Sequence, residues 1–261
     1  MLNNYFYMDK FIKQITKEAG IAILKKFGKV EVKYTKEDAA DVVTEADLTA
    51  NNIITKAIKN KYPSHAIISE ETGEHQNGAE YCWIIDPLDG TRNFLTRTPM
   101  FAVMIGLAHK GKMELATIYN PCTDELFFAK KGKGTFLNGK KVSCSQHKTW
   151  KDSWGLTSVN TTKKNVDNVN KLLKYSEKEK FWMSAFGSAG VSVMYQADGR
   201  RDWRASQGGG LWDYAAASLI LTEAGCKVTN FKGEPWSIKD REILSANKYL
   251  HFKLLKIMNS K

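Results

Sequence analysis

The chain of 261 residues contains 43% hydrophobic and 26% charged residues, a balance that predicts a folded globular protein with one large or two modest domains. Its apolar runs are far shorter than the roughly 20 residues of a membrane-spanning helix, which excludes a transmembrane protein. The formal net charge of +11 is uneven, because residues 1–90 carry 14 acidic and 11 basic side chains whereas residues 91–261 carry 14 and 28.

The N-terminal segment carries Asp9, Lys10 and Lys13 where a secretory signal needs an uninterrupted apolar stretch, so we expect a cytoplasmic protein. The cysteines are widely separated and show no CxxC spacing, which argues against a zinc site or a disulfide framework. We expect reduced, buried thiols at Cys82, Cys122, Cys144 and Cys226.

Two amphipathic helices are predicted first. The residues of Phe11–Phe27 that repeat at helical spacing are apolar, and Gly28 supplies a stop. Thr44 can cap a second helix, which should end before Pro63 because proline disfavours helical geometry in the residue ahead of it.

Short apolar runs separated by Gly, Pro and Asp then predict a sheet, with strands at 66–69, 81–86, 101–108, 114–119 and 125–129. Asn138 and Gly139 are typical of a two-residue hairpin turn between 135–137 and 140–143. Helical patterns return at 163–175, 188–197 and 213–224. We expect a mixed α/β fold in one domain, 1–261, with a soft internal boundary near 145–153.

The segment Trp83–Phe94, WIIDPLDGTRNF, carries the strongest chemical signal. It begins as a buried strand and places Asp86 and Asp89 at the carboxyl end, where ligands bind in open α/β sheets. Two carboxylates there need a cation, and ligands that are all oxygen favour magnesium. Gly90 and Thr91 can point backbone N–H groups at a phosphate, although the same residues also form a good turn.

Three further acidic segments are ambiguous when each is taken alone. Asp47 follows Thr44 at a helix start, where helix capping is the simpler explanation. Glu70 follows an apolar strand, where solubilising charge is common, and Asp213 opens an apolar helix, where it could be an ordinary N-cap. Only the combination of all four segments favours a metal site.

In this order and spacing the four segments resemble the inositol monophosphatase family, with Asp86–Phe94 and Trp212–Ala216 as the most diagnostic stretches. The similarity extends from Met8 onward and leaves Met1 and Met8 both open as the starting residue. It implies a layered αβαβα sandwich of the inositol monophosphatase and fructose-1,6-bisphosphatase type. It also implies a magnesium-dependent, lithium-sensitive phosphatase acting on small phosphate monoesters, usually as a homodimer.

The resemblance also implies a residue for each role. One Mg²⁺ would be held by Glu70, Asp86 and the Leu88 carbonyl, a second by Asp86, Asp89 and Asp213, and a third could lie near Glu70. Asp47, Thr91 and Glu70 are the predicted catalytic residues, in a mechanism where a metal-activated water attacks phosphorus in line. The other predicted contacts are a mobile-loop lysine, Lys36, and the substrate-binding residues Asp89, Gly90, Thr91, Gly187, Ser188, Ala189, Arg204 and Asp213.

One stretch, Asp202–Asp213, departs from the family pattern. Ser206 occupies the place where inositol phosphatases carry a glutamate that contacts ring hydroxyls, and Arg204 and three consecutive glycines are unusual. The stretch could admit a bulkier or more anionic substrate, or be a flexible loop without such a role. A 3′(2′),5′-bisphosphate nucleotide or a sugar bisphosphate is therefore the alternative substrate, and histidinol phosphate is also open.

The basic C-terminal part leaves one alternative of another class, a protein that binds RNA or a transcription complex. Its lysines lack interleaved aromatic residues and fit a solvated surface better than a nucleic-acid site. The complete set of acidic metal ligands also favours an enzyme.

Overall fold

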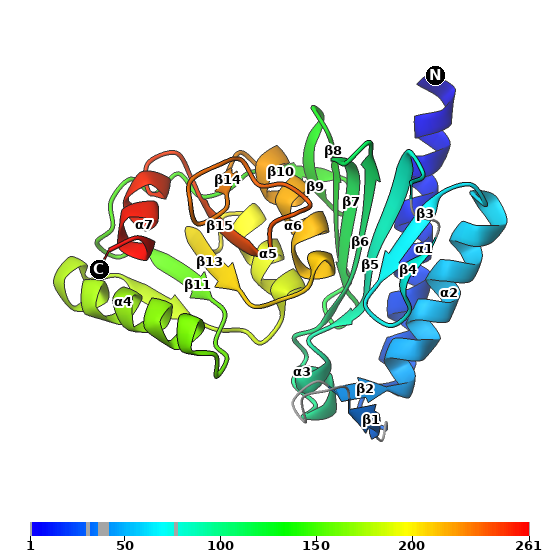
Figure 1. Cartoon of the computed structure of the whole chain (residues 1–261), viewed down its shortest axis with the longest axis horizontal. Coiled ribbons are helices and arrows are strands. Elements are labelled where there is room, and N and C mark those ends of the chain that lie inside the picture. The colour runs from blue at the N-terminus through cyan, green and yellow to red at the C-terminus, as the bar shows by residue number, and fades with distance from the viewer. Residues whose placement is uncertain (1, 30–31, 36–41, 76–77, 261) are drawn as a thin grey trace.

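The structure is a computed structural model that describes residues 2–29, 32–35, 42–75 and 78–260. Figure 1 shows five layers in the order helix, sheet, helix, sheet, helix, which confirms the predicted αβαβα sandwich. Within the described residues, no helix combines the length and the apolar character needed to cross a membrane.

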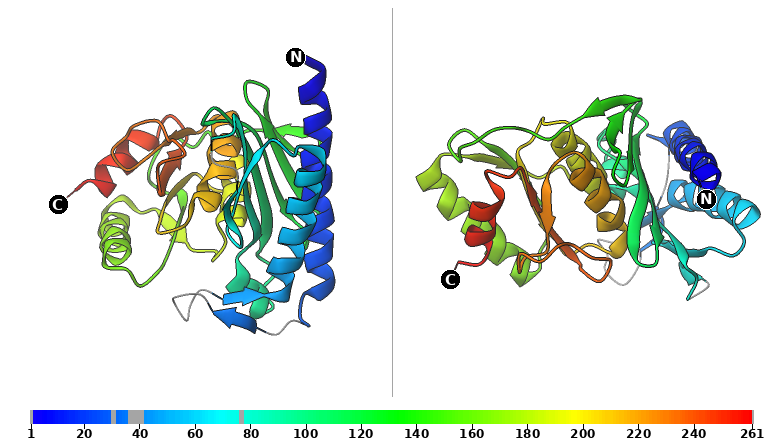
Figure 2. Two further views of the ribbon diagram at one scale, coloured as in Figure 1. Left: turned by 45° about the vertical axis from the view of Figure 1, so that its right-hand side comes forward. Right: turned by 90° about the horizontal axis from the view of Figure 1, so that it is seen from above.

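The first layer consists of α1 (Leu2–Lys26) and α2 (Glu45–Lys61), which lie side by side against one face of the larger sheet (Figure 2). The predicted apolar face of α1 is buried, with Ile15, Ala19 and Ile23 at its centre. The short antiparallel strands β1 (Val32–Thr35) and β2 (Val42–Thr44) lead into α2. The Thr44 hydroxyl accepts the Ala46 N–H at 3.1 Å, so the predicted cap is confirmed.

The larger sheet has the strand order β10-β9-β8-β7-β6-β5-β3-β4. Its members are β3 (Ala66–Ser69), β4 (Gly73–His75), β5 (Tyr81–Asp89), β6 (Ala102–His109), β7 (Lys112–Asn120), β8 (Glu125–Lys130), β9 (Gly134–Leu137) and β10 (Lys140–Val142). Only β3 and β5 run parallel, so their carboxyl ends reach the same edge. The predicted hairpin is confirmed, with positive φ at Asn138 and Gly139.

The middle layer holds α5 (Ala189–Ala197) and α6 (Leu211–Glu223), packed between the two sheets. Helix α6 is apolar on nearly all sides because both sheets cover it. A helix in this region was predicted from the sequence. It begins two residues earlier than predicted, at Leu211, so Asp213 is not the N-cap residue but lies in the first turn, where its side chain accepts the N–H of the N-cap Gly210.

The smaller sheet has the order β12-β11-β13-β15-β14. Its strands are β11 (Trp154–Thr157), β12 (Trp182–Ser184), β13 (Trp203–Gln207), β14 (Lys227–Thr229) and β15 (Glu242–Ala246), and its outer face is covered by α4 (Lys163–Glu179) and α7 (His251–Met258). Residues 143–153 connect the two sheets. The interpretation of 202–210 as a flexible loop was wrong, since most of it is β13, a central strand flanked by β11 and β15.

Candidate metal centre and active site

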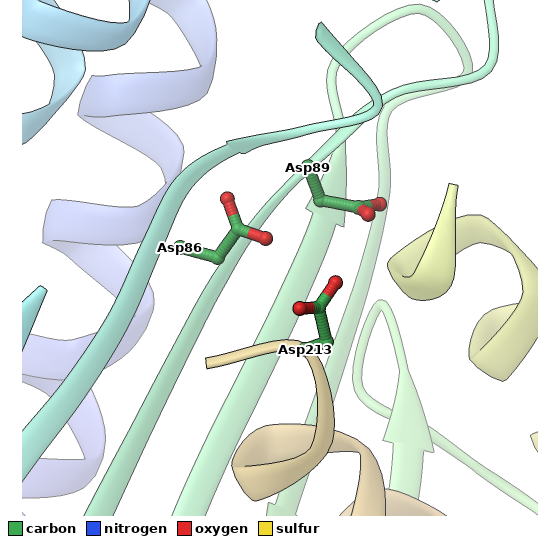
Figure 3. Close-up of side chains that lie close together, drawn as sticks. All are labelled: Asp86, Asp89 and Asp213. Atoms are coloured by element: carbon green, nitrogen blue, oxygen red, sulfur yellow. The ribbon is translucent and has the colours of Figure 1, made fainter. Parts of the chain in front are cut away.

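Strand β5 delivers two carboxylates to one side although they are three residues apart. In a regular strand such residues would face opposite sides of the sheet. The pairing with β6 is regular up to Asp86–Met104 and resumes at Asp89–Ala102 with a shifted register. The shift coincides with Pro87, which has no N–H to donate to the ladder. The irregularity lets Asp86 and Asp89 face the same space, as Figure 3 shows.

The third carboxylate comes from α6, far along the chain. The Gly210 N–H donates to Asp213 Oδ2 at 2.7 Å, which fixes this side chain at the amino end of the helix. One oxygen from each of Asp86, Asp89 and Asp213 lies within 4.8 Å of the other two. Figure 3 shows the three side chains pointing toward one another from the end of β5 and the first turn of α6.

Glu70, the fourth predicted ligand, lies next to this cluster. It directly follows β3, and its N–H donates to the Ile85 carbonyl of the parallel strand β5 at 3.2 Å. The carboxyl groups of Glu70 and Asp86 share a hydrogen bond. Glu70 therefore lies beside Asp86, next to the cluster that Asp86 forms with Asp89 and Asp213.

The electrostatics of the cluster match a cation site. Burial, followed by repulsion from Glu70, Asp89 and Asp213, raises the pKa of Asp86 well above its usual value. Burial and the charge of Asp89 raise the pKa of Asp213 to about 7. Asp86 Oδ1 is buried and has no hydrogen-bond partner within the described residues. Carboxylate oxygens are the ligands that Mg²⁺ prefers, so these residues fit the metal that the resemblance implies.

The raised pKa of Asp213 gives a testable link between pH and metal binding. Without metal, the folded protein holds a proton on this group up to about pH 7, whereas the unfolded chain loses it near 3.8. This group therefore lowers the free energy of unfolding as the pH rises through that window, by at most about 1.4 kcal/mol per pH unit. Mg²⁺ competes with the same protons, so its stabilising effect should grow with pH.

We therefore expect Mg²⁺ to raise the melting temperature more at pH 8 than at pH 6, relative to protein in chelator. Differential scanning fluorimetry at both pH values measures this difference. An equal rise at both values would show that the ion binds elsewhere. The variant Asp213→Asn should show a smaller pH dependence, because one of the titrating carboxyl groups of the cluster is removed.

Asp47 and Thr91 form a hydrogen-bonded pair beside the carboxylates. The Thr91 hydroxyl lies 3.1 Å from Asp47 Oδ1 and 3.0 Å from the Leu88 carbonyl, and can donate to either. The Thr44 N–H and hydroxyl both donate to Asp47 Oδ2, so the capping role of Asp47 and its contact with Thr91 coexist. Burial raises the pKa of Asp47 despite these bonds. That Leu88 binds metal stays a prediction.

A tight turn carries the chain from β5 into the short helix α3 (Thr91–Leu95). Gly90 has φ of 84°, and a Cβ there would lie 2.9 Å from the Met100 carbonyl oxygen and 3.1 Å from Ser188 Cβ. Glycine is required by both the backbone conformation and the close packing. The turn therefore presents the Gly90 and Thr91 backbone beside the carboxylates.

The amino end of α5 holds Asp89 in place. The Ser188 hydroxyl donates to Asp89 Oδ2, the Ala189 N–H donates to Oδ1 at 2.7 Å, and the Gly190 N–H donates to Oδ2 at 2.8 Å. We predicted Gly187, Ser188 and Ala189 as substrate contacts, and the anchoring of Asp89 was missed. An N-cap serine was visible in the sequence, but its partner lies 99 residues away. Their contact with substrate stays a prediction.

These groups open into one cavity of about 330 Å³ between the ends of the two sheets. It is bounded by Asp89, Gly90 and Thr91 on one side and by residues of β13, including Arg204 and Ser206, on the other. Gly187, Ser188, Ala189 and Asp213 also line it. The predicted loop lysine, Lys36, lies outside the described residues.

The three consecutive glycines have a structural reason. Gly208 has φ of 86°, which favours glycine. A Cβ on Gly209 would lie 2.5 Å from Asp213 Oδ2, and one on Gly210 would lie 2.3 Å from the Trp212 ring. The glycines therefore allow β13 to turn into α6 closely enough to seat Asp213. They do not by themselves indicate a bulky substrate.

Comparison with known sequences identifies the family. The sequence model of the inositol monophosphatase family matches residues 5–261. The chain belongs to the inositol monophosphatase family. Among its relatives in this family are the Nus factor SuhB of Pseudomonas aeruginosa, 34% identical over 88% of each chain, and inositol monophosphatase 1 of Homo sapiens, 34% identical over 81% of this chain and 79% of the human one.

A third relative is the fructose-1,6-bisphosphatase/inositol-1-monophosphatase of Thermotoga maritima, 30% identical over 97% of this chain and 96% of the relative. Solved structures of the family have a similar fold. The extragenic suppressor protein SuhB of Bartonella henselae superposes with a TM-score of 0.90 at 30% identity, covering 96% of this chain and 98% of that one. An IMPase of Thermotoga maritima gives 0.88 at 28% identity, covering 96% of both chains.

Proposed function

We propose that the chain is a magnesium-dependent phosphatase that hydrolyses small phosphate monoesters. The observation that carries this proposal is the meeting of Asp86, Asp89 and Asp213 within 4.8 Å, beside the Asp47–Thr91 pair and the Gly90 turn. Converging carboxylates, two of them buried, supply the oxygen ligands that a site for divalent cations requires. The neighbouring hydroxyl and backbone amides are suited to a water and a phosphate.

Each residue has a defined part in this reaction. When bound, Mg²⁺ supplies a Lewis acid that activates water and neutralises charge on phosphate and leaving group. Glu70, Asp86, Asp89, Asp213 and the Leu88 carbonyl would hold it, as two or three ions. The Asp47 carboxylate accepts a hydrogen bond from the Thr91 hydroxyl, which leaves the lone pairs of Thr91 Oγ1 free to accept a hydrogen bond from a water and orient it. The Gly90 and Thr91 amides bind phosphate oxygens as charge develops.

The direct test is phosphate release from four substrates: inositol 1-phosphate, adenosine 3′,5′-bisphosphate, fructose 1,6-bisphosphate and histidinol phosphate. We expect turnover of at least one with Mg²⁺, loss of that turnover with chelator, and inhibition by lithium. Activity that persists in chelator would contradict a magnesium mechanism. Size-exclusion chromatography with light scattering of the same sample tests the homodimer that the resemblance implies.

A second function is favoured by the comparisons. Relatives from Pseudomonas aeruginosa and Salmonella typhimurium carry the name Nus factor SuhB, and residues 91–261 of this chain carry a strong basic excess. We infer that the chain could also join a transcription complex through that part. RNA binding measured at several salt concentrations tests this, because phosphate contacts give a steep salt dependence. Weak, salt-independent binding would reject it.

A further inference from the structure

One arginine that lines the cavity is almost completely buried. Arg204 is the second residue of β13 and is 3% exposed. Its Nη2 donates to Ser206 Oγ at 3.2 Å, while Nη1 is buried and has no hydrogen-bond partner within the described residues. No acidic side chain among those residues forms an ion pair with it, although ten other pairs are formed elsewhere.

A buried, unpaired guanidinium is costly, because burial removes its hydration without returning a full set of acceptors. Arginine cannot shed its charge to escape this cost. Asp89 and Asp213 are near enough to stabilise its charge through space. Those carboxylates are the proposed metal ligands, and bound cations would neutralise their negative charge. Arg204 would then need an anion from outside the protein.

Strand β13 places the Arg204 side chain at the cavity. Residues two apart on a strand face the same side, so Arg204 and Ser206 point the same way. Both line the cavity that Asp89, Gly90 and Thr91 border from the other side. An anion reaching Arg204 and a phosphate held at the Gly90 turn would therefore share one cavity. Gln207 lines the same cavity, and its amide oxygen and nitrogen are buried and have no hydrogen-bond partner in the part of the chain that the structure describes.

We propose that Arg204 is a specificity-determining residue that binds a second anionic group on the alcohol part of the substrate. The preferred substrates are then phosphate monoesters that carry a further phosphate or a carboxylate. A guanidinium forms paired hydrogen bonds with either group. This inference rests on the proposed phosphatase function and adds a substrate class to it.

Position 206 supports the same selection. A glutamate there, as inositol phosphatases usually carry, would lie beside the Arg204 guanidinium and would neutralise it from within the protein. Serine leaves the guanidinium available and removes a carboxylate that would repel an anionic substrate. The two residues therefore act together, since the uncharged neighbour keeps the cation free for ligand.

Two matched substrate pairs test the proposal and identify the anion. Adenosine 3′,5′-bisphosphate and adenosine 3′-monophosphate differ by a phosphate, and 2-phosphoglycerate and glycerol 2-phosphate differ by a carboxylate. We expect the wild type to prefer the more anionic member of at least one pair by kcat/KM. In Arg204→Met that preference should fall at least about tenfold, the size expected for losing a charge-assisted contact. The pair that responds identifies the second anion.

Arg241→Met is the matched control, because it removes the same charge from an exposed arginine outside the cavity. It should change the kcat/KM preference for the more anionic substrate by less than about twofold, because salt screens the effect of a charge on the surface. Ser206→Glu is a second test that keeps Arg204 in place, and it should lower the preference in the same direction. Unchanged preference in both Arg204→Met and Ser206→Glu would overturn the proposal.

Binding separates this inference from the phosphatase proposal. In an Asp47→Asn background with Mg²⁺, isothermal titration calorimetry gives the Kd of adenosine 3′,5′-bisphosphate and of 2-phosphoglycerate without rapid cleavage. Adding Arg204→Met should raise the Kd of the responding ligand at least about tenfold. A wild type that binds such ligands through Arg204 but releases no phosphate would refute the phosphatase proposal alone. Active protein whose ligand affinities do not depend on Arg204 would refute this inference alone.

Discussion

The substitution Asp213→Asn is expected to lower turnover at least about a thousandfold while the fold stays intact. Losing a carboxylate ligand weakens both metal binding and charge stabilisation, and a loss of ~4 kcal/mol in the transition state gives this factor. The asparagine oxygen can still accept the Gly210 N–H that Asp213 Oδ2 accepts at 2.7 Å. The substitution therefore removes the charge and keeps the hydrogen bond that seats the side chain.

The stability of this variant provides a second readout. Asp213 is destabilised as a carboxylate by burial and by Asp89, so in chelator at pH 8 the variant should melt no lower than the wild type. Asp240→Asn is a matched control, because the half-buried Asp240, far from the carboxylate cluster in the sequence, accepts the Ser237 N–H at 2.8 Å across the same three-residue spacing. Near-normal turnover in Asp213→Asn would remove this residue from the mechanism.

Thr91→Val is expected to lower kcat by about 10²–10³, the range for losing a group that positions or takes up a proton. Valine has nearly the shape of threonine, but it has no hydroxyl to donate to Asp47 Oδ1 or to accept from a water. The effect should fall mainly on kcat, since the Gly90 turn and the carboxylates remain. Steady-state kinetics at saturating Mg²⁺ measures both constants.

A variant that restores the hydroxyl distinguishes a functional role of Thr91 from a structural one. Thr91→Ser keeps the hydroxyl and should recover kcat to within about tenfold of the wild type. Asp47→Asn should resemble Thr91→Val, because an amide holds the Thr91 hydrogen less firmly than a carboxylate does. If Thr91→Ser were as slow as Thr91→Val, the hydroxyl would not be the functional group.

Most local elements and the acidic residues of the candidate metal site were accessible from the sequence. Sequence patterns located α1 from Phe11 onward, α2 and every strand of the larger sheet except β4, and Asp86, Asp89 and Asp213 were recognised from short segments and their order. That Asp86 and Asp89 can face one side depends on the register shift at Pro87, which the spacing alone does not reveal. The sequence therefore predicted which acidic residues matter, but it did not predict the backbone geometry that brings them together.

The smaller sheet and the contacts between distant segments were not accessible. Its strands are only three to five residues long, which is too short for an apolar pattern to distinguish them from loops. The bonds from Ser188, Ala189 and Gly190 to Asp89 join residues about a hundred positions apart. Arg204 was noted as unusual, but its burial and unpaired Nη1 follow only from the placement of β13.

Anomalous diffraction from crystals soaked in Mn²⁺ and inorganic phosphate would locate both the ions and the anion. Mn²⁺ accepts the same oxygen ligands as Mg²⁺ and gives a signal that light ions lack. We expect at least two peaks bounded by Glu70, Asp86, Asp89 and Asp213, with phosphate between them and the Gly90–Thr91 amides. Ions found only elsewhere, with these four carboxylates left uncoordinated, would contradict the account.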